Sequence, residues 1–211
     1  MKPNEIKISE KFKAIQGEGL TAGLPVYFIR TSGCNLNCSW CDSKYHKNGK
    51  NYSIEQVVDK IRDSKLEDVV FTGGEPTLQI KKISEIMSYL PRLTFHLETN
   101  GTIYDDFVRD FKFIACSPKK QAISKLESYK KYNDLPQTFF KFVYENKNDQ
   151  WWLDFMKKVN IPGYKVWIMT EGATRDEQIK KMPEVMEYCL KNKFKFSPRL
   201  QVLAYDTKRR K

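Results

Sequence analysis

The chain of 211 residues is 40% apolar and 13% aromatic, a composition that supports a buried core and excludes global disorder. Its 37 basic and 26 acidic residues give a net charge of +11, but most of the excess is lysine spread along the sequence, and only the tail TKRRK at 207–211 forms a run. We therefore expect a single domain over residues 1–211, with a lysine-rich solvated surface rather than a direct nucleic-acid interface.

The sequence contains no stretch that predicts a membrane span or a disulfide framework. No apolar run approaches the roughly 20 residues that cross a bilayer, and the first ten residues, MKPNEIKISE, lack the apolar core of a signal peptide. We expect a cytoplasmic protein without a membrane partner. Five cysteines is an odd number, and the cytosol keeps thiols reduced, so clustered cysteines indicate metal binding or catalysis.

Apolar runs rich in Val, Ile, Phe and Tyr alternate with stretches of helical spacing. In chain order they predict a strand at 26–33, a helix at 53–64, a strand at 68–74, a helix at 78–90, strands at 93–101, 111–118 and 138–146, a helix at 148–158, a strand at 164–170, a helix at 174–191 and a strand at 195–203. Possible capping boxes, Ser53 with Gln56 and Thr174 with Glu177, mark the starts of two helices.

This alternation predicts an α/β protein with a parallel sheet, either open or rolled into a barrel. Parallel sheets hold their ligands at the carboxyl ends of the strands. The segments TSGC, TGGEP, ETNG and CSPK each follow an apolar run directly, so we expect one rim of the sheet to gather them.

Three cysteines, Cys34, Cys38 and Cys41, form the compact pattern C-x3-C-x2-C. A structural zinc takes four ligands, commonly from two separated pairs, and here only His46 is close enough in sequence to complete a set. A 4Fe–4S cluster held by three thiolates would keep one iron open to a substrate or cofactor. The polar insert NLN favours a loop over three buried apolar cysteines.

With Trp40 just before the last cysteine, this pattern resembles the signature of the radical S-adenosylmethionine (SAM) superfamily. The resemblance implies that the open iron binds SAM and that the reduced cluster cleaves it to a 5′-deoxyadenosyl radical. The segment TGGEP at 72–76 resembles the second motif of the superfamily. For this chain the resemblance implies that Gly74 meets the methionyl amino group of SAM, while Glu75 and Pro76 shape the turn.

Further segments, FKAIQGEG at 12–19, CDS at 41–43, ETNG at 98–101, SPK at 117–119 and SPRLQVL at 197–203, resemble the 7-carboxy-7-deazaguanine synthase family of the queuosine precursor pathway. The similarity runs from about residue 12 to residue 205. It implies an incomplete β/α barrel of the radical SAM type with a mostly parallel sheet. It also implies a lyase that contracts 6-carboxy-5,6,7,8-tetrahydropterin to 7-carboxy-7-deazaguanine with loss of ammonia, with SAM as a recovered cofactor and Mg²⁺ assisting.

The resemblance assigns expected roles to individual residues. The cluster ligands are Cys34, Cys38 and Cys41. The pterin contacts are Ile15, Gln16, Gly17, Glu18, Arg30 (for the substrate carboxylate) and Thr72. The SAM contacts are Trp40, Cys41, Asp42, Gly74, Glu98, Asn100, Ser117, Pro118 and Lys119.

Ser43 departs from the family, which commonly has threonine there, but its hydroxyl oxygen still suits Mg²⁺. Cys116 and Cys189 are expected to be buried thiols without chemistry, and Arg199 and Gln201 receive no firm role.

The basic surface suits an acidic electron donor such as a flavodoxin or ferredoxin, and family analogy suggests a homodimer. Two other interpretations stay open at this point. A radical SAM enzyme that installs a glycyl radical on a partner protein would fit the short chain and basic surface. A zinc-binding nucleic-acid module would fit the cysteines, His46 and the charge, but would leave TGGEP unexplained.

Overall fold

A computed structural model describes residues 4–38, 41, 48–148 and 150–208 of the chain. The chain divides into two compact units. The first comprises Met1–Ala14, Pro25–Thr99 and Ile103–Ile114, and the second comprises Ile15–Leu24, Asn100–Thr102 and Ala115–Lys211. Whether residues 1–211 act as one domain stays a prediction, and each unit is described by itself.

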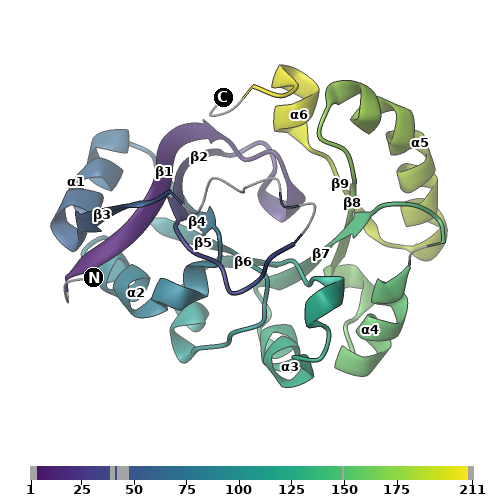
Figure 1. Ribbon diagram of the computed structural model, residues 1–211, viewed down its shortest axis with the longest axis horizontal. Coiled ribbons are helices and arrows are strands. Elements are labelled where there is room, and N and C mark those ends of the chain that lie inside the picture. The colour runs from purple at the N-terminus through teal and green to yellow at the C-terminus, as the bar shows by residue number, and fades with distance from the viewer. Residues whose placement is uncertain (1–3, 39–40, 42–47, 149, 209–211) are drawn as a thin grey trace. The chain divides into compact units, whose positions relative to one another are not determined.

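The first unit contains five strands in the order β3-β1-β2-β4-β5. They are β1 (Glu5–Ile15, whose last residue belongs to the second unit), β2 (Pro25–Thr31), β3 (Lys50–Ser53), β4 (Asp68–Gly73) and β5 (Thr94–Thr99). β2, β4 and β5 run parallel, whereas β3 pairs antiparallel with β1 (Figure 1). The register of β2 on β4 runs from Val26 opposite Asp68 to Thr31 opposite Gly73, so these two strands end together.

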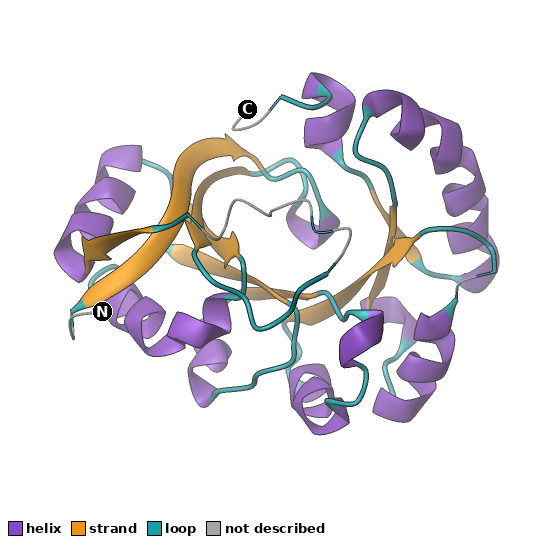
Figure 2. Cartoon of the chain, viewed as in Figure 1, coloured by secondary structure: helices purple, strands orange, loops and turns teal. Residues whose placement is uncertain are grey.

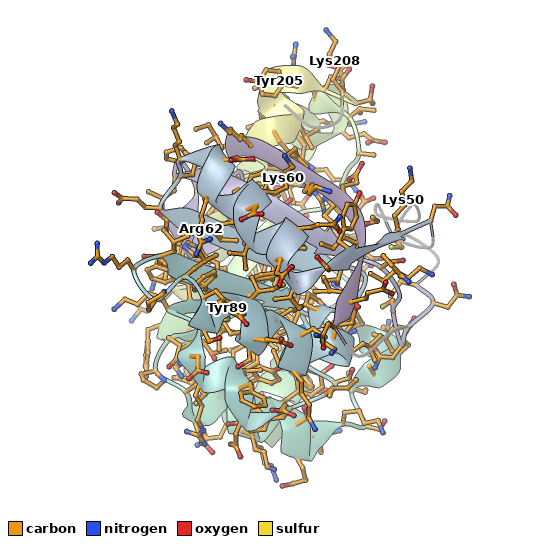
Figure 3. The ribbon with its side chains drawn as sticks, turned by 90° about the vertical axis from the view of Figure 1, so that its left-hand side faces the viewer. Lys50, Lys60, Arg62, Tyr89, Tyr205 and Lys208 are labelled. Carbon is orange, nitrogen blue, oxygen red and sulfur yellow. The ribbon has the colours of Figure 1, made fainter. Side chains whose placement is uncertain are left out.

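Helices α1 (Ile54–Ser64) and α2 (Ile80–Ser88) belong to the first unit, with the 3-10 turns η3 (Pro76–Gln79) and η4 (Asp106–Asp110). The capping box predicted for α1 is present: Ser53 Oγ accepts from Gln56 N at 3.1 Å, and Gln56 Oε1 accepts from Ser53 N at 3.0 Å. The apolar side of α1 is buried, whereas the side chains of Lys60 and Arg62, labelled in Figure 3, are exposed.

The second unit contains the parallel strands β7 (Thr138–Tyr144), β8 (Val166–Thr170) and β9 (Lys195–Ser197). Strand β6 (Phe113–Cys116) has residues in both units. Helices α3 (Leu126–Asp134), α4 (Trp151–Val159), α5 (Arg175–Asn192) and α6 (Leu200–Tyr205) follow the strands in alternation, with short turns η1 (Gly19–Thr21), η5 (Lys120–Ala122) and η6 (Gly163–Lys165) (Figure 2).

Aromatic side chains fill the core of the second unit. Phe142 of β7 packs against Trp152 and Phe155 of α4, with ring centroids 6.3 Å and 6.2 Å apart. Tyr129 of α3 meets Phe155 edge-on at 4.9 Å. Rings bury large apolar areas and hold defined mutual geometry, so this layer gives the strand ends of the second unit a rigid support.

Most predicted elements are present, but the strand predicted at 195–203 is wrong beyond Ser197. Strand β9 ends there, and helix α6 begins at Leu200. Pro198 lacks a backbone N–H and cannot continue the ladder, whereas Leu200, Gln201, Leu203 and Ala204 are good helix formers.

Strands β1 and β3 were not predicted. In β1, Ile6, Ile8 and Glu10 alternate as buried positions, because alternate residues of a strand share one face. This alternation could have predicted the strand. No helix in the described part of the chain is both long and apolar enough to cross a membrane.

Candidate functional site

The cysteine loop leaves the carboxyl end of β2. Residues 32–38 form neither helix nor strand, as predicted. Cys34, Cys38 and Cys41 are partly exposed, and none of the three forms a disulfide. Leu36 N donates to Cys34 Sγ at 3.4 Å, and Cys41 N donates to Cys38 O at 3.3 Å. Backbone N–H groups of the loop therefore hydrogen-bond to a cysteine sulfur and to a cysteine carbonyl within the same loop.

The glycine pair of TGGEP packs against the start of this loop. Gly74 N donates to Thr31 O at 3.1 Å, and Glu75 N donates to Gly33 O at 2.8 Å. A Cβ on Gly74 would lie 1.8 Å from Gly33 O, and one on Gly73, whose φ is +121°, would lie 2.4 Å from Thr31 O. Both positions require glycine because the backbone before Cys34 occupies that space. The two motifs, far apart in sequence, thus form one hydrogen-bonded unit.

Glu75 builds the turn after the glycines. Its side chain is fully buried, and Oε1 accepts hydrogen bonds from Thr77 N (3.1 Å), Thr77 Oγ1 (2.7 Å) and Thr99 Oγ1 (2.7 Å). Glu75 is the N-cap of η3 and Pro76 occupies its first turn, so both residues shape the turn as expected. The contact with Thr99 fixes this turn to the end of β5.

Two further predicted residues meet at the ends of β4 and β5. Thr72 Oγ1 donates to Glu98 Oε2 at 2.7 Å, and Thr31 Oγ1 donates to Thr72 O at 3.2 Å. Thr72 was assigned to the pterin and Glu98 to SAM, and the structure brings the two side chains into direct contact. The carboxyl ends of β2, β4 and β5 gather their polar residues, as the parallel-sheet rule predicts.

Gln79 is a residue that the sequence reasoning missed. Its Oε1 accepts from Lys7 N at 2.8 Å, and its Nε2 donates to Lys7 O at 3.0 Å and Ser32 O at 3.4 Å. Ser32 N also donates to Lys7 O at 2.9 Å. The buried amide therefore ties β1 to the residue where the cysteine loop begins. A glutamine between Leu78 and Ile80 gives no sequence signal that separates this role from a surface position.

Burial raises the pKa of the Cys34 thiol, and the nearby Glu75, Cys38 and Cys41 raise it further, while the N–H of Leu36 lowers it. Three thiolates in such a loop therefore need a strong positive charge to stay ionised together.

Arg30 lies near the end of β2 with a carboxylate already beside it. Its Nε is 3.4 Å from Glu10 Oε2, and its guanidinium lies 5.5 Å from the ring centre of Phe12 and 5.8 Å from that of Phe28. A guanidinium has five N–H donors in a planar fork, so a second carboxylate could share the group with Glu10.

In the second unit, the segment Gln16–Gly19 is a closed turn. Gln16 N donates to Leu24 O and Gly23 N donates to Gln16 O, both at 2.8 Å. Glu18 N donates to Gln16 Oε1 at 3.2 Å, which uses the amide of Gln16 inside the turn. Ile15, just before the turn, is exposed.

The same turn sits on the connection between β9 and α6. Gly19 N donates to Ser197 Oγ at 2.8 Å, and Leu200 N donates to Gly17 O at 3.0 Å. A Cβ on Gly17 would lie 1.8 Å from Gln201 Oε1, so a larger residue there would displace the Gln201 amide. QGEG and SPRLQVL, which together supported the family resemblance, are therefore neighbours in space.

Glu18 lies at the centre of a group that we call the Glu18 cluster: Glu18, Lys141, Arg199 and Gln201. Glu18 Oε2 accepts from Lys141 Nζ at 2.5 Å, and Oε1 accepts from Arg199 Nε at 3.1 Å and Gln201 Nε2 at 2.7 Å. The side chains of Glu18, Lys141 and Arg199 are 15%, 10% and 12% exposed. Arg199 also donates to Gly172 O at 2.7 Å, which fixes its fork.

The charge of Glu18 is set by its neighbours. Burial raises the pKa of Glu18, but the charges of Lys141 and Arg199 and the hydrogen bonds of Lys141 and Gln201 outweigh that effect and hold the pKa well below its usual range. A carboxylate offers about four acceptor positions, and the contacts described above occupy two on Oε1 and one on Oε2. Glu18 can therefore accept one more hydrogen bond as an anion.

The remaining predicted residues fall into three groups. Ser117 and Lys119 lie beside the Glu18 cluster: Lys119 Nζ donates to Ser117 Oγ at 2.9 Å, and Ser117 Oγ donates to Lys141 O at 3.1 Å, with Pro118 between them. Asn100 turns the chain through its Oδ1, which accepts from Thr102 N at 2.9 Å. Trp40, Asp42 and Ser43, together with His46, lie outside the described residues.

The chain resembles known proteins over most of its length. The model of the Radical SAM superfamily matches residues 28–170. A 7-carboxy-7-deazaguanine synthase of Pyrobaculum aerophilum is 30% identical over 98% of this chain and 97% of that protein, and one of Hyperthermus butylicus is 31% identical over 94% and 92%. The crystal structure of QueE from Escherichia coli aligns with a TM-score of 0.68 and 21% identity over 92% of this chain and 93% of that one.

These matches, with the cysteine loop bonded to TGGEP at the ends of parallel strands, define a radical SAM enzyme. The fold is the predicted incomplete β/α barrel with a mostly parallel sheet. Within that superfamily, the chain belongs to the 7-carboxy-7-deazaguanine synthase family. Membership implies a 4Fe–4S cluster and SAM as cofactors.

The described residues fit that cluster. Among them, no three Cys, His, Asp or Glu side chains converge on a point that one metal ion could occupy. A 4Fe–4S cluster does not need such a point, because each thiolate binds a different iron. The N–H of Leu36 directed at Cys34 Sγ is the kind of contact that stabilises a cluster thiolate.

Proposed function

We propose that this protein converts 6-carboxy-5,6,7,8-tetrahydropterin to 7-carboxy-7-deazaguanine by radical ring contraction with loss of ammonia. The observation that carries the proposal is the Glu18 cluster. It holds a mostly buried, ionised carboxylate with one free acceptor position on the turn that resembles the family's pterin-binding segment. A pterin edge carries amino and ring N–H donors, which such an anion accepts well.

For the cofactors, we propose that Cys34, Cys38 and Cys41 hold the cluster, which supplies the electron for cleaving SAM. Gly74 is proposed to meet the methionyl amino group, because hydrogen bonds from Gly74 N to Thr31 O and from Glu75 N to Gly33 O fix its backbone next to the cysteine loop. The other proposed SAM contacts are Trp40, Cys41, Asp42, Glu98, Asn100, Ser117, Pro118 and Lys119. Of these, Glu98 is oriented by the hydroxyl of Thr72.

For the substrate, each unit offers its own contacts. In the second unit we propose Ile15, Gln16, Gly17 and Glu18, of which the last is ionised and oriented by two cations. In the first unit we propose Thr72 and Arg30, with Arg30 shared between Glu10 and the carboxylate of the pterin. Lys141, Arg199 and Gln201 act through Glu18 and are positioning residues.

We further propose Ser43 as a Mg²⁺ ligand, an acidic flavodoxin- or ferredoxin-like protein as electron donor, and a homodimer in the cytoplasm. The donor is supported by the lysines of β1 and β3, such as Lys7 and Lys50, since Lys7 O accepts from Ser32 N at the start of the cysteine loop. An acidic protein would be attracted to such a surface, and the attraction would weaken with salt.

The proposed activity is tested by anaerobic turnover of the reconstituted protein with SAM, a chemical reductant, Mg²⁺ and the carboxypterin, followed by mass spectrometry. We expect 7-carboxy-7-deazaguanine to accumulate with little net loss of SAM. Cleavage of SAM to 5′-deoxyadenosine without any deazapurine would leave the radical chemistry intact and overturn the proposed substrate.

A further inference from the structure

The turn at Asn100–Thr102 is hydrogen-bonded to helix α3, and both belong to the second unit (Figure 1). Tyr129 Oη donates to Asn100 O at 3.1 Å, and Ser128 Oγ donates to Gly101 O at 2.7 Å. Two neighbouring side chains of α3 thus hold two successive backbone carbonyls of the turn.

Close packing fixes the position of the Tyr129 hydroxyl. Tyr129 and Cys116 are fully buried, and a Cβ on Gly101 would lie 2.6 Å from Tyr129 Cε1 and 2.4 Å from Cys116 Sγ. Gly101 has a φ of +76°, so the turn needs glycine both for its backbone conformation and for space. Phe155 packs edge-on against the Tyr129 ring at 4.9 Å. The ring is therefore confined, with its hydroxyl at Asn100 O.

The side chain of Asn100 closes the turn. Its Oδ1 accepts from Thr102 N at 2.9 Å and from Thr102 Oγ1 at 2.6 Å. A carbonyl oxygen has two acceptor positions, and both are filled here. The Asn100 side chain can therefore meet a ligand only through its amide N–H groups. The ribose hydroxyls and the carboxylate of SAM are acceptors that suit such donors.

We propose that Tyr129 and Ser128 are positioning residues for SAM, which hold Asn100 where its amide donates to that cofactor. The proposal rests on the proposed function for the contact between Asn100 and SAM. The hydrogen bonds from Thr102 to Asn100 Oδ1 already give the turn its shape. The two bonds from α3 add a fixed place relative to the helix, and a ligand contact depends on place as well as on shape.

Equilibrium dialysis of SAM against the anaerobically reconstituted protein, without pterin, tests the proposal. Tyr129→Phe keeps the ring and removes the hydroxyl, so we expect the Kd for SAM to rise about fivefold, the effect of one net hydrogen bond. Ser128→Ala should raise it in the same way. Iron content measured for each variant verifies that the cluster is loaded equally.

Tyr144→Phe is the matched control. Tyr144 is also buried, and its hydroxyl donates to Glu184 Oε1 of α5 at 2.8 Å rather than to the turn. Both tyrosine variants lose one hydroxyl bond and should lose similar stability in urea, but only Tyr129→Phe should bind SAM more weakly. A wild-type Kd in Tyr129→Phe, or an equal rise in Tyr144→Phe, overturns the proposal.

Hydrogen exchange of the protein without its cluster gives a second readout that needs no bound SAM. The Thr102 N–H bonds to Asn100 Oδ1, so its exchange reports the order of the turn. It should exchange faster in Tyr129→Phe and at the wild-type rate in Tyr144→Phe. Unchanged exchange in Tyr129→Phe would show that the hydroxyl does not order the turn, and would contradict the proposal.

Asn100→Ala tests the route by which Tyr129 acts. This variant should itself weaken SAM binding, and adding Tyr129→Phe should weaken it no further, because the amide that Tyr129 positions is gone. A further fivefold loss in the double variant would exclude the route through Asn100. These measurements contain no pterin, so a failure of the proposed substrate leaves them valid, whereas a wild-type Kd in Asn100→Ala would overturn the proposed SAM contact itself.

Discussion

Two glutamates, each beside a glycine, are held in opposite ways: Glu75 is fully buried and Glu18 is mostly buried. Glu75 in the first unit accepts hydrogen bonds from the uncharged Thr77 and Thr99, close to it in sequence or on the neighbouring strand end. Glu18 in the second unit is contacted by Lys141 and Arg199, which come from distant parts of the chain.

The difference separates a residue that builds a turn from one that serves a ligand. Glu75 is the N-cap of η3, and its hydrogen bonds with Thr77 and Thr99 hold that turn. Removing two cations and an anion from water is expensive, and apolar residues of similar size often stabilise a fold as well or better. A fold alone would not require the Glu18 cluster, so its presence favours a role in binding.

The largest effect is expected from replacing a cysteine of the cysteine loop in the first unit. Cys38→Ala should abolish cluster assembly and SAM cleavage, because two thiolates cannot replace three, while the fold stays largely intact. Iron and sulfide content, visible absorbance and circular dichroism measure this directly. A variant with full iron content and normal turnover would rule out the cluster assignment.

Replacing the two glutamates should separate stability from binding. Glu75→Ala leaves the buried donors of Thr77 and Thr99 unsatisfied, at about 1–3 kcal/mol each, and should lower the free energy of unfolding in urea. Glu18→Gln should raise the KM for the pterin at least tenfold, since it removes the anion that is proposed to contact the substrate. If Glu18→Gln changes only stability and leaves the KM unchanged, the distinction between the two glutamates fails.

Lys141→Met should make the Glu18 cluster sensitive to pH. The folded pKa of Glu18 is depressed, so its stabilising contribution is complete above the unfolded pKa of about 4.3 and is lost only as the pH falls through the much lower folded value. Without Lys141, burial still raises the pKa while its largest opposing charge is gone. Protonation then moves toward neutral pH.

The measurement is the KM for the pterin and the free energy of unfolding between pH 5 and 8. In wild type, neither the KM nor the free energy of unfolding should change with pH. In Lys141→Met, the KM should rise and the free energy of unfolding should fall as the pH is lowered, and Lys141→Arg should restore the wild-type behaviour. An equally flat profile in Lys141→Met would show that Lys141 does not control the charge of Glu18.

Gln79→Leu should loosen the start of the cysteine loop with a moderate effect. It removes the side-chain hydrogen bonds to Lys7 N, Lys7 O and Ser32 O, and we expect a several-fold lower iron content after reconstitution together with a broadened electron paramagnetic resonance spectrum. Gln79→Glu is the matched comparison, because it keeps the acceptor for Lys7 N and removes the donor to Ser32 O. Normal iron content and an unchanged spectrum in both variants would limit Gln79 to a purely structural role.

The smallest effect is expected at Ser43. Ser43→Ala should weaken the dependence of turnover on added Mg²⁺ by several-fold, and Ser43→Thr should preserve it, since both serine and threonine offer a hydroxyl oxygen. The test is a Mg²⁺ titration at saturating SAM, and an identical titration curve for Ser43→Ala removes this residue from the metal shell.

Local patterns in the sequence predicted those parts of the molecule that local forces determine. The capping box at Ser53, the loop character of the cysteine segment and the gathering of strand ends all follow from neighbouring residues or from one general rule for parallel sheets. The resemblance then assigned roles to Glu18 and Gly74.

Contacts between residues far apart in the chain could not be predicted from the sequence. Lys141 and Arg199 are separated from Glu18 by 123 and 181 positions, and nothing in their own neighbourhoods marks them as its partners. The close approach of Gly74 to Gly33 is likewise a product of strand register. Pro198 could have predicted the end of β9, but the strand predicted at 195–203 ran past it.

Electron paramagnetic resonance of the reduced, reconstituted protein with and without SAM tests the central claim most directly. Three cysteines on the cysteine loop leave one iron for SAM, so we predict a 4Fe–4S signal whose g values shift when SAM is added. A cluster signal that SAM leaves unchanged, or reconstituted protein that takes up no 4Fe–4S cluster, would contradict the account.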